Sequence, residues 1–320
     1  MGKIVTLGEV VADVYREQAP SPVELPFTAR PGGAPANVAV AAARLGVEAG
    51  FVGRLGDDLF GDFILEALEA SGVDTSAILR QEPPTRTTLA FVEVFEDGDR
   101  EFTFYRSVPA ADELLAPEDI RPESLAGASF ANFGSIPLLK EPVRSATRRF
   151  AELANEMDVA VAFDVNLRAN LWDSLDAFRE AVHPLIELSS VLKLSEDELG
   201  PVLGVHDAGE AADRLLDRGV SLALVSRGAE GAFYATGAFR GHAPAFPIEE
   251  VVDATGAGDA FLAGTLARLS ESPGWTEDET AVREAVRWGT AAGALACSHF
   301  GAMQGLPTRD ELESFMSVRR

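Results

Sequence analysis

The sequence has very little lysine, a large excess of acid and one cysteine. Only three of its 27 basic residues are lysines (Lys3, Lys140 and Lys193), and 51 acidic residues give a formal net charge of −24. Because nucleic-acid binding needs a basic surface, this charge argues against a nucleic-acid partner. The acid excess fits a protein that its charge keeps soluble in concentrated salt. It also fits GC-rich coding without salt adaptation, and both interpretations stay open.

The sequence also lacks features typical of secreted and membrane proteins. The single cysteine, Cys297, cannot form an internal disulfide, which is typical of a protein in a reducing cytoplasm. It lies in an alanine-rich stretch, and we interpret it as a small buried core residue rather than a reactive thiol. No run of 18 apolar residues is present, so no membrane span is predicted. Residues 1–8 are interrupted too soon for a signal peptide and predict a buried strand instead.

Common nucleotide and metal motifs are missing too. The chain has no Gly-x4-Gly-Lys-[Ser/Thr] loop and no Gly-x-Gly-x-x-Gly placed after a strand. This argues against P-loop kinases and dinucleotide-dependent dehydrogenases. His299 is one of only four histidines, and no other His or Cys lies at a metal-ligand spacing from it. We therefore interpret His299 as structural.

What is present is an alternation of short apolar runs with amphipathic stretches. The 320 residues suffice for one large α/β domain, and we interpret residues 1–320 as a single domain. The pattern predicts a mostly parallel sheet with helices on both faces, a three-layer α/β/α arrangement whose ligands bind beyond the carboxyl ends of the strands. The expected strands are 4–7, 50–52, 128–133, 159–164, 191–194 and 222–226, with a hairpin within 231–240. The expected helices are 35–45, 58–70, 141–157, 176–188, 208–218, 258–269 and 280–298.

Two strand-rich stretches, about 10–33 and 85–106, break this alternation. Within the second, residues 87–94 and 100–105 flank Glu96-Asp97-Gly98-Asp99, which is typical of a β-hairpin. We expect these stretches to form a small separate sheet over the site, a lid. Its exposed edges would invite a partner strand, so a homodimer through the lid is a possible assembly.

The most specific motif is the run Asp253-Ala254-Thr255-Gly256-Ala257-Gly258-Asp259, which a helical pattern follows at once. A glycine-rich turn that opens a helix leaves backbone N–H groups unpaired, and with the helix dipole these suit a phosphate. Asp259 would lie in the first helical turn, where a carboxylate is held ionised and ready to accept a proton from a hydroxyl. An Asp that merely caps the helix is the simpler alternative, but the full string favours phosphoryl transfer.

A second polar group lies near the N-terminus. Asp13 follows the first strand, and Gly32-Gly33 precedes the helix that carries Asn37. The Asp and Asn are short polar groups that can hydrogen-bond sugar hydroxyls, and the glycines would let backbone approach a ligand closely. Taken singly, each is better explained as a turn or an exposed helix residue. Glu9 is interpreted as an exposed or sheet-end residue without a chemical role.

Together these strings resemble the ribokinase/fructokinase-like (PfkB) carbohydrate kinase family over essentially the whole chain. The resemblance rests on Pro31–Asn37 and Asp253–Asp259, with Phe51–Asp58, Lys193–Glu198 and Val225–Gly231 between them. Within the family the chain is most similar to fructokinases. That similarity rests on Phe104–Arg106 with Ala110–Asp112, on Phe133–Leu138, and on Phe163–Arg168 with Leu171-Trp172.

The resemblance implies a ribokinase-like fold and a role for each matched residue. Asp259 would be the base, and the N–H groups of Gly256, Ala257 and Gly258 an anion hole. The sugar would bind Asp13, Gly32, Gly33 and Asn37, and Arg106 on the lid would touch sugar or phosphate. The ATP contacts would be Arg168, Ser195, Ser226, Gly228, Gly231 and Gly258.

The resemblance also implies two cations. Glu198 would hold Mg²⁺, through water, although Ser195 stands where the ribokinase form of the motif has Asn. Asp253 and Thr255 would bind an activating K⁺, completed by carbonyls near Ala296, His299 and Gly301.

The implied activity is ATP-dependent phosphorylation of D-fructose to fructose 6-phosphate. A kinase for 2-keto-3-deoxygluconate, another sugar or a nucleoside stays an alternative. A silent sugar-binding regulator on the same fold is a further one, although the base and the glycine-rich turn are both intact.

Overall fold

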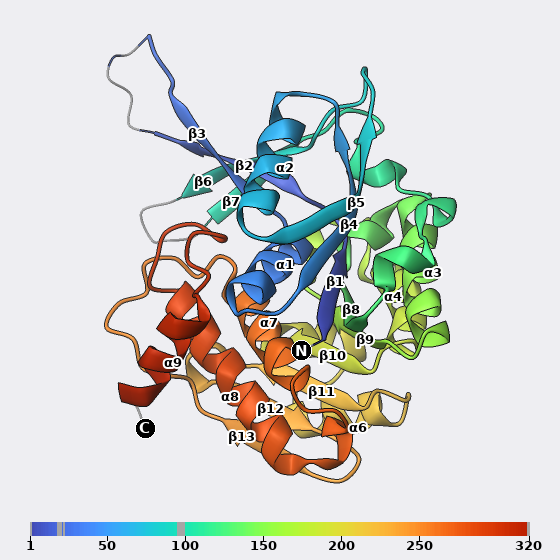
Figure 1. The fold of residues 1–320 in the computed structure, drawn as a ribbon, viewed down its shortest axis with the longest axis vertical. Helices are drawn as coiled ribbons and strands as arrows, with labels where there is room; N and C mark the ends of the chain where they lie inside the picture. The colour runs from blue at the N-terminus through green and yellow to red at the C-terminus, as the bar shows by residue number, and fades with distance from the viewer. Residues whose placement is uncertain (1, 18–20, 22, 95–99, 319–320) are drawn as a thin grey trace.

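The computed structural model describes residues 2–17, 21, 23–94 and 100–318 (Figure 1). The predicted hairpin turn at Glu96-Asp97-Gly98-Asp99 lies outside the described residues. None of the helices in the described ranges is long and apolar enough to cross a membrane.

A nine-stranded sheet forms the centre of the molecule, in the order β13-β12-β11-β10-β9-β8-β1-β4-β5. Its neighbours pair in parallel except at β11–β12 and β12–β13, which are antiparallel. The strands are β1 Lys3–Leu7, β4 Ala49–Gly56, β5 Val73–Gln81, β8 Ala128–Phe133, β9 Ala160–Asp164, β10 Val191–Ser195, β11 Leu222–Ser226, β12 Ala232–Ala235 and β13 Arg240–Ala243.

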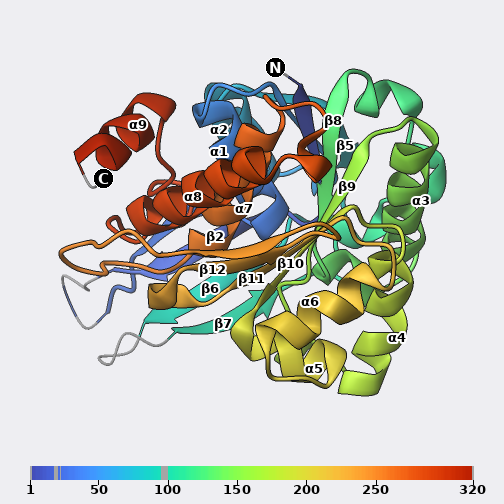
Figure 2. The ribbon, with the colours of Figure 1, turned by 90° about the horizontal axis from the view of Figure 1, so that it is seen from below.

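Helices cover both faces of this sheet, as predicted. Figure 2 shows α1, α7 and α8 on one side and α3, α4 and α6 on the other. In β1 the side chains alternate between two hydrophobic cores, Ile4 facing one and Val5 and Leu7 the other. The helices are α1 Ala34–Arg44, α2 Leu59–Ala70, α3 Val143–Glu156, α4 Leu175–Ile186, α5 Leu199–Leu203, α6 Ala208–Leu216, α7 Ala257–Leu269, α8 Glu279–Ala296 and α9 Arg309–Val318.

A separate four-stranded sheet has the order β3-β2-β6-β7 and confirms the predicted small second sheet, while its action as a lid stays a prediction. β2 follows β1 after only Gly8-Glu9-Val10, so the small sheet begins at the carboxyl end of a central strand. Arg30 Nη1 donates to the carbonyl of Phe300 at 3.2 Å, which ties the small sheet to the loop after α8. Its strands are β2 Val11–Arg16, β3 Phe27–Gly32, β6 Leu89–Val94 and β7 Arg100–Tyr105.

Candidate active site

Asp259 lies in the first turn of α7, as predicted, and only 7 % of it is exposed. The helix begins after Gly256, whose φ of 79° lies in the left-handed region that favours glycine. A Cβ at Gly256 would lie 3.2 Å from the Cα of Ala302, so this turn also packs closely on the C-terminal loop. The sequence therefore fixes both the helix start and the place of its first acidic side chain.

The partner of Asp259 is Asn37, on α1. Its Nδ2 donates to Asp259 Oδ2 at 2.7 Å, across 222 residues of sequence. Burial raises the pKa of Asp259, against the Asn37 hydrogen bond and the positive charges of Lys193 and Arg168. Desolvation therefore outweighs the groups that favour the ionised form of this carboxyl. A raised pKa makes the carboxylate a stronger proton acceptor.

The glycines before α1 make room for protein atoms. A Cβ at Gly32 would lie 2.1 Å from Asp13 Oδ2, and one at Gly33, whose φ is 106°, would lie 2.6 Å from the Glu9 carbonyl oxygen. The two glycines therefore let β3 close over the start of β2 and leave space for the Asp13 carboxylate.

A cavity of about 370 Å³ joins the two predicted groups of residues. Because its walls come from the small sheet, α1 and α7, the structure brings the predicted acceptor residues and the predicted base around one space. Its lining includes Glu9, Asp13, Gly33, Asn37, Phe104, Arg168, Thr255, Gly256 and Asp259.

Arg106 lies elsewhere. Its Nη1 is 3.3 Å from Glu113 Oε1 and 3.7 Å from Asp112 Oδ2, on the short helix η1 (Asp112–Leu114). It lines a larger hollow of about 590 Å³ next to α3 and α4 rather than the cavity around Asp259. The contact of Arg106 with a sugar or phosphate thus stays a prediction.

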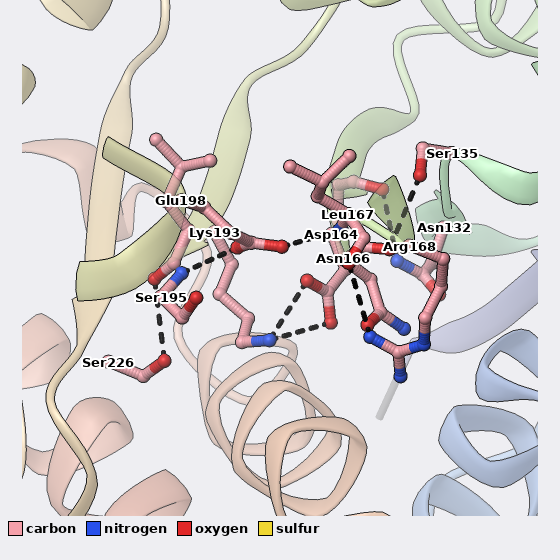
Figure 3. Close-up of polar contacts among 12 residues, drawn as sticks. Asn132, Ser135, Asp164, Asn166, Leu167, Arg168, Lys193, Ser195, Glu198 and Ser226 are labelled. Carbon is pink, nitrogen blue, oxygen red and sulfur yellow. Dashed lines mark hydrogen bonds and ion pairs between the residues drawn. The ribbon is translucent and has the colours of Figure 1, made fainter. Parts of the chain in front are cut away.

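Lys193 and Asp164 form a buried ion pair beside the start of α7 (Figure 3). Lys193 Nζ lies 2.9 Å from both carboxylate oxygens of Asp164. Burial raises the pKa of Asp164 to about 6, against the opposing effect of Lys193. Burial by itself would lower the pKa of Lys193, but Asp164, Glu198 and Asp259 together raise it. A Cβ at Gly258 would lie 3.0 Å from Lys193 Nζ, so the ammonium group lies against the predicted anion hole.

The predicted ATP contacts lie at the carboxyl ends of adjacent strands. Ser195 ends β10 and Ser226 ends β11, and the two are register partners. Gly228, with a φ of 53°, has open space where a side chain would be, whereas a Cβ at Gly231 would lie 2.1 Å from the Ala243 carbonyl oxygen. Gly231 is thus required by packing against β13. Arg168 is exposed, and its Nη1 donates to Leu167 O at 3.4 Å.

The carboxylate of Glu198 binds two backbone N–H groups, a contact that the sequence did not predict. Its Oε1 accepts from the N–H of Leu167, and its Oε2 from the N–H of Ser195 at 2.7 Å (Figure 3). Each oxygen of this carboxylate accepts one backbone N–H and keeps a second lone pair, so the predicted water-mediated contact with Mg²⁺ stays a prediction. Within the part of the chain that the structure describes, no group of three or more His, Cys, Asp or Glu side chains is placed to hold a metal ion.

The two segments predicted to hold K⁺ lie side by side. Asp253 Oδ1 accepts from Thr255 N at 2.7 Å and Oδ2 from Gly301 N at 2.8 Å. Cys297 follows the last residue of α8 and is partly exposed, so its interpretation as a buried core residue was wrong, although partial burial still raises the pKa of its thiol. Its carbonyl accepts from the N–H of Asp253. Carbonyl-rich backbone beside a buried carboxylate suits a hard cation that takes oxygen ligands.

Three residues at the site had no assigned role in the sequence analysis: Lys193, Asp164 and Glu9. The burial of Lys193 could have been predicted from the sequence, since it is one of three lysines and falls inside an apolar strand pattern. A buried lysine needs a buried acid partner, and Asp164 ends the neighbouring strand. Glu9 does lie just past the end of a sheet strand, between β1 and β2, but it is only 5 % exposed, so its interpretation as an exposed residue was wrong.

Comparison with known proteins assigns the family. The model described as pfkB family carbohydrate kinase matches residues 1–309. The chain belongs to this family. It is 38% identical over 316 residues to Fructokinase-1 of Oryza sativa subsp. japonica, covering 98% of this chain and 97% of that one.

Solved structures of the family agree in fold. The fructokinase of Xylella fastidiosa with bound ATP superposes with a TM-score of 0.88 at 32% identity, covering 99% of this chain and 98% of that one. The aminoimidazole riboside kinase of Salmonella enterica, complexed with its riboside and an ATP analogue, gives 0.85 at 35%, covering 98% and 99%. The kinase therefore has the ribokinase-like fold with its small second sheet.

Proposed function

We propose that this carbohydrate kinase transfers the γ-phosphoryl group of ATP to the 6-hydroxyl of D-fructose, with Asp259 as the base. The observation that carries the proposal is the Asp259–Asn37 pair, which lies at the glycine-opened start of α7 and lines the 370 Å³ cavity. The named relatives support the donor and the acceptor, since one is a fructokinase and one binds ATP.

The proposed chemistry needs few groups. Asp259 accepts the proton of the attacking hydroxyl, and its raised pKa favours that transfer. Of the three N–H groups in the predicted anion hole, that of Ala257 donates to the Ala254 carbonyl at 3.2 Å. The proposal therefore gives the N–H groups of Gly256 and Gly258 the charge that develops on the phosphoryl group. Lys193, held against Gly258, and the exposed Arg168 add positive charge on the donor side. Sugar binding in the cavity displaces water, which otherwise competes as an acceptor.

Metal ions enter as part of this proposal. Mg²⁺ bound to the ATP phosphates would neutralise charge there, and Glu198 would reach it through water while its own oxygens hold Leu167 and Ser195 in place. A K⁺ ion would take its oxygens from the joined 253–255 and 296–301 segments.

One alternative to fructose as the phosphoryl acceptor is supported by the comparisons. The riboside kinase is 35% identical to this chain and the solved fructokinase 32%, so a nucleoside or riboside is the alternative that the comparisons support. Another sugar, including 2-keto-3-deoxygluconate, stays an alternative on the sequence motifs alone. A non-enzymatic regulator is disfavoured, because the chain keeps Asp259 and the glycine-rich turn at the start of α7.

A substrate panel tests the proposal. With ATP and MgCl₂, ADP release coupled to NADH oxidation should be fastest for fructose among fructose, ribose, 2-keto-3-deoxygluconate, aminoimidazole riboside and adenosine. The product should be fructose 6-phosphate by ³¹P NMR. A kcat/KM at least tenfold higher for any other acceptor would replace fructose, and no ADP release with any sugar would favour the regulator.

Potassium should activate the enzyme. We expect kcat/KM to be several-fold higher in 100 mM KCl than in 100 mM NaCl at equal ionic strength, because K⁺ would order the backbone next to Gly256. Replacing Asp253 by Asn should abolish the difference between the salts. Equal rates in KCl, NaCl and tetramethylammonium chloride would contradict a monovalent-ion site.

A further inference from the structure

Glu9 is buried where the central sheet passes into the small one. It stands between β1 and β2, it is 5 % exposed, and its Oε2 is buried with no hydrogen-bond partner among the described residues. An unpaired polar atom in the interior costs free energy, so such an atom calls for an explanation. Glu9 also lines the cavity that contains Asp13, Asn37 and Asp259.

A second buried polar atom without a hydrogen-bond partner among the described residues belongs to Asn37, which lines the same cavity. Asn37 uses its Nδ2 on Asp259, while its Oδ1 is buried and has no partner in the described ranges. An amide oxygen can only accept a hydrogen bond, whereas a neutral carboxylic acid can donate one. One acceptor and one donor together match hydroxyl groups, each of which both donates and accepts.

Charged groups from several elements surround Glu9. Asp259 approaches from α7, Asp112 from η1 and Arg106 from the end of β7, and Glu113 and Lys140 line a void of about 10 Å³ that Glu9 shares with Arg106. The pKa of Glu9 is raised to about 8, chiefly by burial and in smaller part by Asp112 and Asp259, while its own backbone N–H and Arg106 oppose the shift. The side chain is therefore neutral near pH 7 despite the cation nearby.

We propose that Glu9 is a substrate-binding residue whose neutral carboxyl donates a hydrogen bond to one hydroxyl of the sugar. A neighbouring hydroxyl of the sugar donates to Asn37 Oδ1. The role rests on the proposed kinase function and adds an acceptor-site contact to it. Ionisation of Glu9 removes the donor and places a second negative charge near Asp259. Activity at alkaline pH is then limited by weaker binding of the sugar, and not by weaker binding of ATP.

The kinetic test follows the KM for the sugar from pH 6 to 9.5, with whichever acceptor the panel identifies. In the wild type this KM should rise above about pH 8, approaching tenfold per pH unit, while the KM for ATP stays flat. Glu9→Gln keeps a neutral donor and should lose the alkaline rise. Glu9→Leu should raise the sugar KM about tenfold at every pH, since it removes the hydrogen bond. Glu113→Gln, a buried carboxyl outside the cavity, should keep the alkaline rise.

A second readout needs no sugar. Between pH 4.5 and 8 the folded protein keeps a proton on Glu9 that the unfolded chain releases, so rising pH destabilises the wild type but not Glu9→Gln. The melting temperature of Glu9→Gln should therefore exceed that of the wild type by a margin that grows from pH 5 to pH 8.5. If the margin grows while the sugar KM profiles of the two proteins coincide, Glu9 is structural only and the binding role is overturned. If the melting temperatures of the wild type and Glu9→Gln change with pH in the same way, Glu9 is not a buried neutral carboxyl. Neither result depends on which sugar is the substrate.

Discussion

Replacing Asp259 by Asn should lower kcat for sugar phosphorylation by about 10²–10⁴-fold, the range that a positioned general base contributes. Asn has nearly the same shape, and its side-chain oxygen can still accept the hydrogen bond that Asn37 donates to Asp259 at 2.7 Å. The fold and the ATP site should therefore survive, so that the KM for ATP changes less than kcat does. Steady-state kinetics with purified variant and wild type measure this.

Two controls make the Asp259→Asn result specific. Asp62→Asn, on the first turn of α2, removes a carboxylate at another helix start and should leave kcat within twofold. The melting temperature of Asp259→Asn should not fall, because removing a buried negative charge with a raised pKa relieves desolvation. Near-normal kcat in a folded Asp259→Asn protein would mean that another group takes the proton.

Replacing Lys193 by Met should be the most destabilising of the single changes considered for this protein. The side chains of Lys193 and Asp164 are 7% and 6% exposed, and removing one partner of such a pair leaves an uncompensated charge at a cost of about 3–5 kcal/mol. The variant should also lose kcat about 10²-fold, since it removes a cation beside the anion hole. Urea unfolding and kinetics at 20 °C measure the two effects.

A double-mutant cycle separates these effects. Adding Asp164→Asn to Lys193→Met removes the orphaned carboxylate, so most of the lost stability should return while kcat stays low. If kcat recovers together with stability, Lys193 only holds the structure. If Lys193→Met unfolds no more easily than the wild type, the ion pair adds nothing to stability.

Local signals predicted much of this molecule from its sequence. Buried parallel strands form continuous apolar runs, and the start of α2 is marked by Asp58, whose side chain accepts from the N–H of Phe60 and Gly61. The glycine-rich turn before Asp259 predicted the start of α7, and the chemistry it indicates stays a prediction. These features need only a few neighbouring residues to specify them.

Edge elements and buried polar partners were harder to predict. β5 lies at the edge of the large sheet with most side chains half-exposed, so its sequence lacks the apolar run of a central strand. α9 was likewise not predicted. The burial of Glu9 and the double backbone contact of Glu198 depend on segments far away in the chain, and neither has a local signature.

The most direct test of the account is a crystal structure of the kinase with fructose and a non-hydrolysable ATP analogue. The account predicts the 6-hydroxyl within about 2.6–3.2 Å of an Asp259 carboxylate oxygen, the reach of a general base. It also predicts the γ-phosphate at the N–H groups of Gly256 and Gly258, in line with that hydroxyl. A sugar bound in the 370 Å³ cavity with every hydroxyl out of reach of Asp259, or phosphates bound away from the start of α7, would contradict it.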